Sequence, residues 1–129
     1  MPYTLILHER PAYLHVTVSG DNSPETVRAY LREVLAACIA RGVSALLIEE
    51  HLDGPPFDLL DVFRIASEES LRAKPQIERL AWVDTNPDHP HANMQFAENV
   101  AVNRGLHMRV FPGVAEAEEW MAGGATAAG

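Results

Sequence analysis

Apolar and polar side chains alternate early in the chain, which is the pattern of an extended strand with one buried face. Between residues 13 and 19 the apolar set is Leu14, Val16 and Val18, and the opposite set is Tyr13, His15 and Thr17. Segments 3–8 and 13–19 therefore predict two strands, and residues 8–12 predict a turn that joins them in a β-hairpin. In this register, His15 is expected on an exposed strand face.

The segment from Ser23 to Gly42 has the period of a helix. Ser23 fits the N-cap, Pro24 fits the first helical position, and Gly42 fits the stop. The apolar positions form a single helical stripe, which consists of Val27, Tyr30, Leu31, Val34, Leu35, Cys38 and Ile39. Because Cys38 lies within this stripe, it is predicted to be a small core residue and not a reactive thiol.

Strands and helices continue to alternate along the rest of the chain. The apolar run 45–49 predicts a buried strand, and Asp58 can cap a helix that continues to about Ala73. The residues expected on the inner face of that helix are Leu59, Leu60, Phe63 and Ala66. Further strands are expected at 77–83 and 108–111, with a helix from 90 or 91 to 105 between them. The last expected helix carries Val114, Ala117, Trp120 and Met121.

This order, ββαβαβαβα, predicts an α/β fold with a mixed, mostly parallel five-stranded sheet packed by helices. Strands joined through helices should be parallel, and the first hairpin strand should lie antiparallel at one edge. The chain has 129 residues, enough for one hydrophobic core, so residues 1–122 are predicted to form a single domain. Residues 123–129 contain only Gly, Ala and Thr and are expected to be a flexible tail.

Charge and cysteine content exclude several classes of protein. The net charge is -8 and the ten basic residues form no cluster, which argues against a nucleic-acid ligand. The single cysteine and the absence of a secretory pattern at residues 1–20 predict a cytoplasmic protein. No apolar tract approaches the ~18 residues that span a bilayer, so no membrane span is expected.

Polar residues follow two of the predicted strands at the edge where parallel sheets collect ligands. These residues are Glu49, Glu50, His51 and Asp53 after one strand, and Asp84, Thr85, Asn86 and Asp88 after the next. Their negative charge opposes phosphate binding. Capping of turns and helices explains Asp53, Asp58 and Asp88 better than binding of a metal ion does. A zinc site is the alternative for His89 and His91, with His51 as a third ligand, but these histidines are better explained as loop residues. Glu49 and Glu50, as neighbours in a strand, point to opposite faces. No cofactor or enzymatic activity is therefore predicted.

The chain resembles STAS domains, the family that includes bacterial anti-sigma-factor antagonists. The resemblance rests on the hairpin 3–19, the helix 23–41, the strand and loop 44–57, and the ending Val110-Phe111 with Ala117 and Trp120. Within the family, the chain is most similar to stand-alone bacterial proteins that also resemble lipid-binding CRAL-TRIO domains. The resemblance implies a regulatory protein-interaction module. STAS phospho-switches carry Ser or Thr before the second helix, whereas this chain has neither between Ser44 and Ser67.

The resemblance also implies where a protein partner makes contact. The predicted contact residues are Leu52, Asp53, Pro55, Pro56, Phe57 and Asp58. Phe57 has a second interpretation, a hydrophobic staple that packs on Val62. An alternative function is a carrier or sensor of a small apolar, lipid-like ligand, in a pocket lined by Trp82, Met94 and Phe96, although such residues usually belong to the core. A metal-dependent hydrolase is the third hypothesis, and a homodimer is compatible with the sequence.

Overall fold

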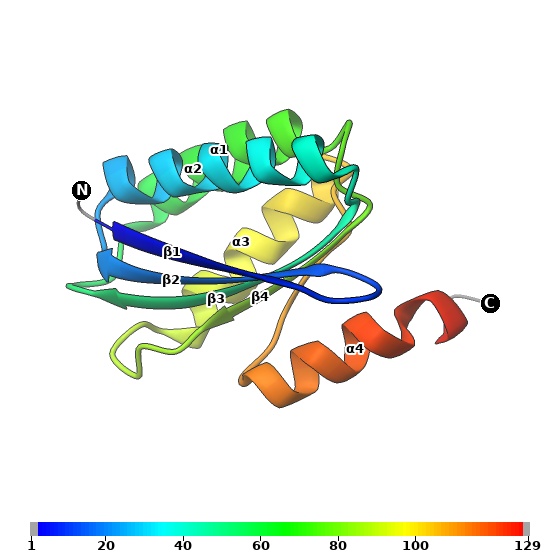
Figure 1. The fold of residues 1–129 in the computed structure, drawn as a ribbon. Coiled ribbons are helices and arrows are strands. Elements are labelled where there is room, and N and C mark those ends of the chain that lie inside the picture. The colour runs from blue at the N-terminus through cyan, green and yellow to red at the C-terminus, as the bar shows by residue number, and fades with distance from the viewer. Residues whose placement is uncertain (1–2, 128–129) are drawn as a thin grey trace.

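A computed structural model describes residues 3–127, which form one five-stranded sheet with helices on both faces (Figure 1). The strands are β1 (Tyr3–Glu9), β2 (Leu14–Asp21), β3 (Ala45–Asp53), β4 (Arg79–Asp84) and β5 (Met108–Val110). They lie side by side in chain order. β1 pairs antiparallel with β2, and the remaining pairs are parallel. The predicted α/β class, the hairpin and the mixed, mostly parallel sheet are thereby confirmed.

The helices divide unequally between the two faces of the sheet. They are α1 (Pro24–Arg41), α2 (Leu59–Ala73), α3 (His91–Asn103) and α4 (Val114–Ala127). The first three cover one face, and α4 lies on the other (Figure 1). α4 continues to Ala127, past the predicted domain end at 122, and the last two residues of the predicted tail, 128–129, lie outside the described residues. No helix within residues 3–127 is long and apolar enough to cross a membrane.

The helix caps are those that the sequence predicts. The Ser23 side chain accepts a hydrogen bond from the Thr26 backbone N–H, and Gly42 ends α1 in the left-handed conformation at φ 66°. Asp58 caps α2, because its Oδ1 accepts from the Asp61 backbone N–H at 2.8 Å.

Each face of the sheet has its own core. The main core lies between the sheet and α1–α3 and includes Leu14, Val16, Val18, Tyr30 and Ile48. A smaller core under α4 consists of Tyr13, Ala45, Leu47, Ala81, Val83, Ala117 and Met121. Residues 14–16, at the start of β2, are buried on both faces of the sheet. The exposed position predicted for His15 is wrong: this residue is only 5% exposed, because the His8 ring lies 5.2 Å away across the hairpin and Glu49 pairs with it from β3.

Two predicted inner faces also differ from the structure. Ile39 on α1 is 57% exposed. On α2, the apolar residues at the helix start face outward: Leu59 is 57%, Leu60 55% and Phe63 40% exposed. The buried positions of α2 are Ile65, Ala66, Glu69 and Ser70. This face can be buried although it carries Glu69, because Arg28 and Arg32 from α1 each lie 3.8 Å from the Glu69 carboxylate.

Candidate functional site

The candidate site lies at the end of β3, which is longer than the sequence predicts. The strand continues to Asp53 and not only to residue 49, so Glu50 is part of the sheet. Alternation along the strand sends Glu49 and Glu50 to opposite faces, as predicted. Glu49 lies on the α4 side with His15, whereas Glu50 enters the main core and is 4% exposed. The acidic edge expected from the sequence is therefore divided between two environments.

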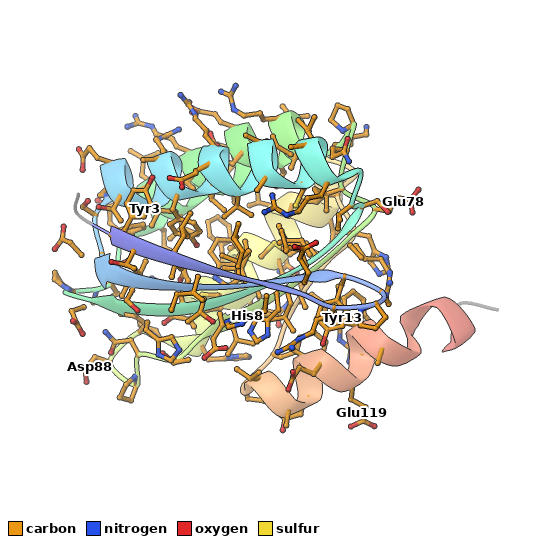
Figure 2. All side chains as sticks on the ribbon, viewed as in Figure 1. Tyr3, His8, Tyr13, Glu78, Asp88 and Glu119 are labelled. Carbon is orange, nitrogen blue, oxygen red and sulfur yellow. The ribbon has the colours of Figure 1, made fainter. Side chains whose placement is uncertain are left out.

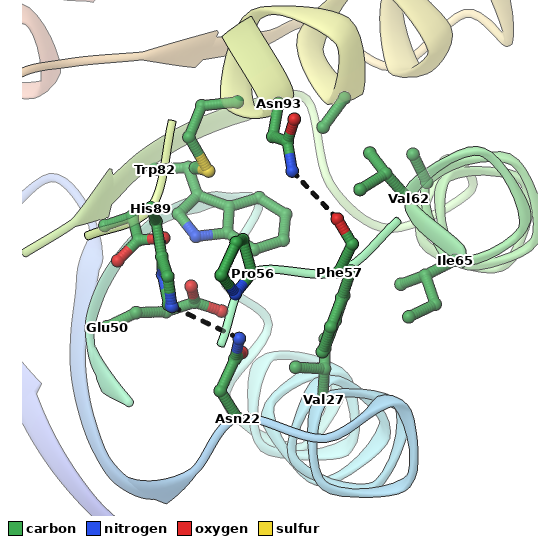
Figure 3. Close-up of a pocket in the computed structure, with 14 residues that line it drawn as sticks. Asn22, Val27, Glu50, Pro56, Phe57, Val62, Ile65, Trp82, His89 and Asn93 are labelled. Atoms are coloured by element: carbon green, nitrogen blue, oxygen red, sulfur yellow. Dashed lines mark hydrogen bonds and ion pairs between the residues drawn. The ribbon is translucent and has the colours of Figure 1, made fainter. Parts of the chain in front are cut away.

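Glu50 forms part of the floor of a pocket between the sheet, α2 and α3 (Figure 3). The cavity is about 70 Å³ and is mainly apolar. Its apolar lining consists of Val27, Pro56, Phe57, Val62, Ile65, Ala66, Trp82, Met94 and Ala97. Its polar lining consists of Asn22, Glu50, Asp84, His89 and Asn93. Of the three residues predicted to line a ligand pocket, Trp82 and Met94 are among the lining residues. Phe96 is not among the lining residues and instead packs, partly buried, against the main core.

The Glu50 carboxyl group is held by Tyr30. Tyr30 lies on α1 and its side chain is fully buried. Its hydroxyl group donates a hydrogen bond to Glu50 Oε2. Burial is the largest effect on Glu50 and raises its pKa to about 7, although the hydrogen bond from Tyr30 acts in the opposite direction. The nearby Asp84 charge raises this pKa further. The indole N–H of Trp82 lowers this pKa without a hydrogen bond to Glu50, since Trp82 Nε1 is buried and has no hydrogen-bond partner among residues 3–127.

A second polar pair lies at the mouth of the pocket. His89 Nδ1 is 2.6 Å from Asp84 Oδ2, and His89 Nε2 is 2.9 Å from the Gly54 carbonyl oxygen. Burial alone would lower the pKa of His89, but these two partners outweigh it and raise the pKa. Because both ring nitrogens have partners, His89 is not free to ligate zinc with His91. Within residues 3–127 no group of three or more metal-ligating side chains is placed to hold a metal ion.

Side-chain amides fix the loop between β3 and α2. Asn22 Nδ2 donates to the Pro55 carbonyl at 2.8 Å, and Asn93 Nδ2 donates to the Phe57 carbonyl at 3.0 Å. Gly54 has φ 126°, a conformation that glycine adopts without strain. The loop is therefore held from two sides in one shape over the pocket.

The predicted contact residues separate into three groups. Asp53, Pro55, Pro56 and Asp58 are exposed. Phe57 is half-buried and lines the pocket together with Val62, the pair expected for a hydrophobic staple. Leu52 is only 1% exposed and belongs to the main core. It was predicted as a contact residue, which is wrong, because β3 extends through it and turns its side chain inward.

The α4 side of the sheet holds a separate hydrogen-bonded chain. Glu49 accepts from His15 Nε2 at 2.9 Å and from His51 Nε2 at 2.5 Å. Burial would raise the pKa of Glu49, but the two histidines outweigh it and lower the pKa. Thr85 Oγ1 lies 3.0 Å from His51 Nδ1 and donates to the Glu50 carbonyl. Figure 2 shows His8 and Tyr13 on this same side of the hairpin. Since the Thr85 hydroxyl donates to a backbone carbonyl, it is not arranged as a nucleophile.

Sequence reasoning missed the buried pair of Glu50 and Tyr30. A signal for it exists, because Leu46, Ile48, Glu50 and Leu52 continue one period-two series with its side chains on the same face. Tyr30 lies in the apolar stripe of α1, which faces that side. A predicted strand that ends at Glu49, the first charged residue, leaves Glu50 out of the sheet and so misses its contact with Tyr30.

Two solved structures are similar to this fold. An anti-sigma factor antagonist from Mycobacterium paratuberculosis has 15% sequence identity and a TM-score of 0.56, over 93% of this chain and 94% of that one. An uncharacterised protein of the DUF3478 family with a SpoIIAA-like fold, from Shewanella loihica PV-4, has 15% identity and a TM-score of 0.52, over 92% of this chain and 93% of that one. No family model and no curated protein matches the chain. The predicted STAS-like fold is thereby confirmed.

Proposed function

We propose that the chain is a cytoplasmic regulatory module that binds another protein through its α2 contact surface. This surface consists of the exposed loop residues Asp53, Pro55, Pro56 and Asp58 and the exposed helix residues Leu59, Leu60 and Phe63. The observation that carries the proposal is the exposure of those three large apolar side chains in the first five residues of α2. Neighbouring exposed apolar residues of this kind are typical of interaction sites.

The loop beside these residues supports the same role. Its carbonyls are held by Asn22 and Asn93, so little conformational entropy is lost when a partner docks. Asp58 and Asp61 add negative charge at the start of α2, and the whole chain carries -8. A partner with an apolar patch bordered by basic or neutral residues is complementary to this surface.

The similarity to an anti-sigma factor antagonist supports a regulatory role, with one difference in mechanism. The contact surface contains no serine or threonine, and the chain has neither between Ser44 and Ser67. We therefore propose that phosphorylation at this surface does not control binding. Asp58 provides a permanent negative charge there, but its Oδ1 is already used to cap α2.

The experiment compares two variants of matched exposure. Leu59→Asp combined with Leu60→Asp changes the contact surface, and Ile39→Asp changes an equally exposed site on α1. Each exposed substitution should alter the free energy of unfolding by no more than about 0.5 kcal/mol. Immobilised wild type and variants are incubated with extract from the source organism, and retained proteins are quantified by mass spectrometry.

We expect at least one protein to be retained by wild type and Ile39→Asp and lost by the double variant. With that protein purified, the double variant should raise Kd by roughly 30-fold or more, the effect of a binding hot spot. Equal retention by all three baits would contradict the proposal.

The pocket supports a second candidate function, a sensor of a small ligand. Its lining is mainly apolar and includes a few polar groups, the usual composition of a small-molecule site. Pro56 and Phe57 line it, so a ligand would lie directly under the α2 contact surface. Nothing in the site favours the metal-dependent hydrolase over these two binding roles.

A further inference from the structure

We propose that this pocket binds a small organic cation, a primary ammonium group on a compact apolar body, with the Glu50 carboxylate as its counter-ion. The proposal rests on the second function above, the small-ligand pocket, and specifies the chemistry of the ligand. It does not depend on the protein-partner proposal.

The first argument is the charge inside the pocket. Buried carboxylates are ordinarily paired with a cation, yet no lysine or arginine lines the described pocket. Three ionisable groups face Glu50: Tyr30 from α1, Asp84 from β4, and His89 from the loop before α3. α2 presents only Val62, Ile65 and Ala66 to the cavity. When Glu50 is ionised, the opposite charges of Asp84 and His89 cancel each other, and the pocket keeps one net negative charge. A monocation neutralises it, whereas an anionic ligand would face two carboxylates.

The second argument is the balance of hydrogen-bond donors and acceptors. Tyr30 donates to one oxygen of Glu50 and leaves Oε1 for another donor. The amide nitrogens of Asn22 and Asn93 each donate to a loop carbonyl, and Asn22 Nδ2 also lies 3.3 Å from His89 Nε2. An ammonium group has three donors, and one of them can bind Glu50 Oε1. Trp82 also lines the cavity, and its ring attracts a cation.

The third argument is size. A cavity of about 70 Å³ has room for roughly six water-sized atoms. This volume suits a branched or cyclic body of about six carbons and is too small for a long acyl chain. The pocket thus favours a ligand much smaller than the lipid-like molecule suggested by the sequence resemblance.

The test uses two probes of the same shape, cyclohexylamine and cyclohexanol. Each is titrated into ¹⁵N-labelled protein at pH 6 and pH 8, and Kd is taken from the shifts of the indole N–H signal of Trp82. That signal is assigned by its absence in Trp82→Phe. Cyclohexylamine remains charged at both pH values, as a lysine side chain does. The pH dependence of its binding therefore reports on the protein.

We expect cyclohexylamine to bind about ten-fold more tightly than cyclohexanol at pH 8. A group with a pKa of about 7 is about ten times more ionised at pH 8 than at pH 6, so the amine should lose about ten-fold in affinity at pH 6. The affinity for cyclohexanol should change little between the two pH values. Glu50→Gln keeps the side-chain shape but removes the charge, and it should abolish the preference for the amine.

Three outcomes would overturn the inference. Equal affinities for the two probes at pH 8 would be compatible with the small-ligand function but would contradict a preference for a cation. An amine preference that persists in Glu50→Gln would remove Glu50 as the counter-ion. Binding of neither probe would overturn both the inference and the small-ligand function. If Glu50→Gln does not fold, the probe comparison in wild type at the two pH values still decides the question.

Discussion

The substitution Glu50→Gln should make the protein more stable, and by an amount that depends on pH. Glutamine keeps the size of the side chain and an acceptor for the Tyr30 hydroxyl. It removes a buried carboxyl group whose pKa lies near neutral pH. The variant therefore isolates the free-energy cost of a carboxylate inside the fold.

The magnitude follows from the pKa of Glu50 in the two states. The ordinary value of 4.5 applies to the unfolded chain, and burial raises it to about 7 in the folded protein. Below pH 4.5 both states are protonated and the cost is absent. Between pH 4.5 and 7 the unfolded state loses its proton first, so the free energy of unfolding falls as the pH rises. Above pH 7 the cost is constant, on the order of 3 kcal/mol.

The assay is urea unfolding of wild type and Glu50→Gln at pH 5 and pH 8, followed by circular dichroism. The difference between the two proteins should shift by about 2 to 3 kcal/mol in favour of glutamine from pH 5 to pH 8. Titrating groups that do not interact with Glu50 affect both proteins and cancel in this difference, whereas His89, whose pKa Glu50 helps to raise, cancels only in part. A difference that is the same at both pH values would refute the assignment of Glu50 as a buried acid with a raised pKa.

Two further substitutions test neighbouring parts of the site. Tyr30→Phe leaves the buried carboxyl group of Glu50 without its hydroxyl donor and should lower the free energy of unfolding in urea by about 1 to 3 kcal/mol. The loss should be larger at pH 8, where the carboxylate is charged. An equal loss at pH 5 and pH 8 would contradict the role given to the hydroxyl. Asp58→Ala removes the N-cap of α2 and should cost about 1 kcal/mol, whereas Asp58→Asn should retain most of that stability because asparagine also caps helices. Equal losses in the alanine and asparagine variants would show that the cap hydrogen bond is not what stabilises the helix start.

The loop between β3 and α2 links the two proposed binding functions. Phe57 lines the pocket with its half-buried side chain, and its neighbours Pro56 and Asp58 belong to the α2 contact surface. The backbone of this loop is held by Asn22 from the β2–α1 connection and by Asn93 from α3. A ligand beneath Phe57 and a protein on α2 would therefore contact opposite sides of the same short segment.

Local patterns predicted the order of elements well, because their signals lie within a few residues. Ser23, Pro24 and Gly42 mark the ends of α1 through the hydrogen bonds of their own turns. Asp58 marks the start of α2 in the same way. Strand boundaries were less accurate, and β3 continues four residues beyond its predicted end. Its continuation depends on pairing with β2, where Asp21 lies opposite Asp53.

The sequence by itself determined the α/β order, the mixed sheet, the helix caps and the absence of serine and threonine between Ser44 and Ser67, since each depends on neighbours along the chain. The tertiary structure alone decided which face of α2 is buried. It also buried His15 between His8 and Glu49 and brought Tyr30 to Glu50 across twenty residues. These features depend on which surfaces meet when the helices pack on the sheet. Periodicity identifies an apolar face, but only packing decides what covers it.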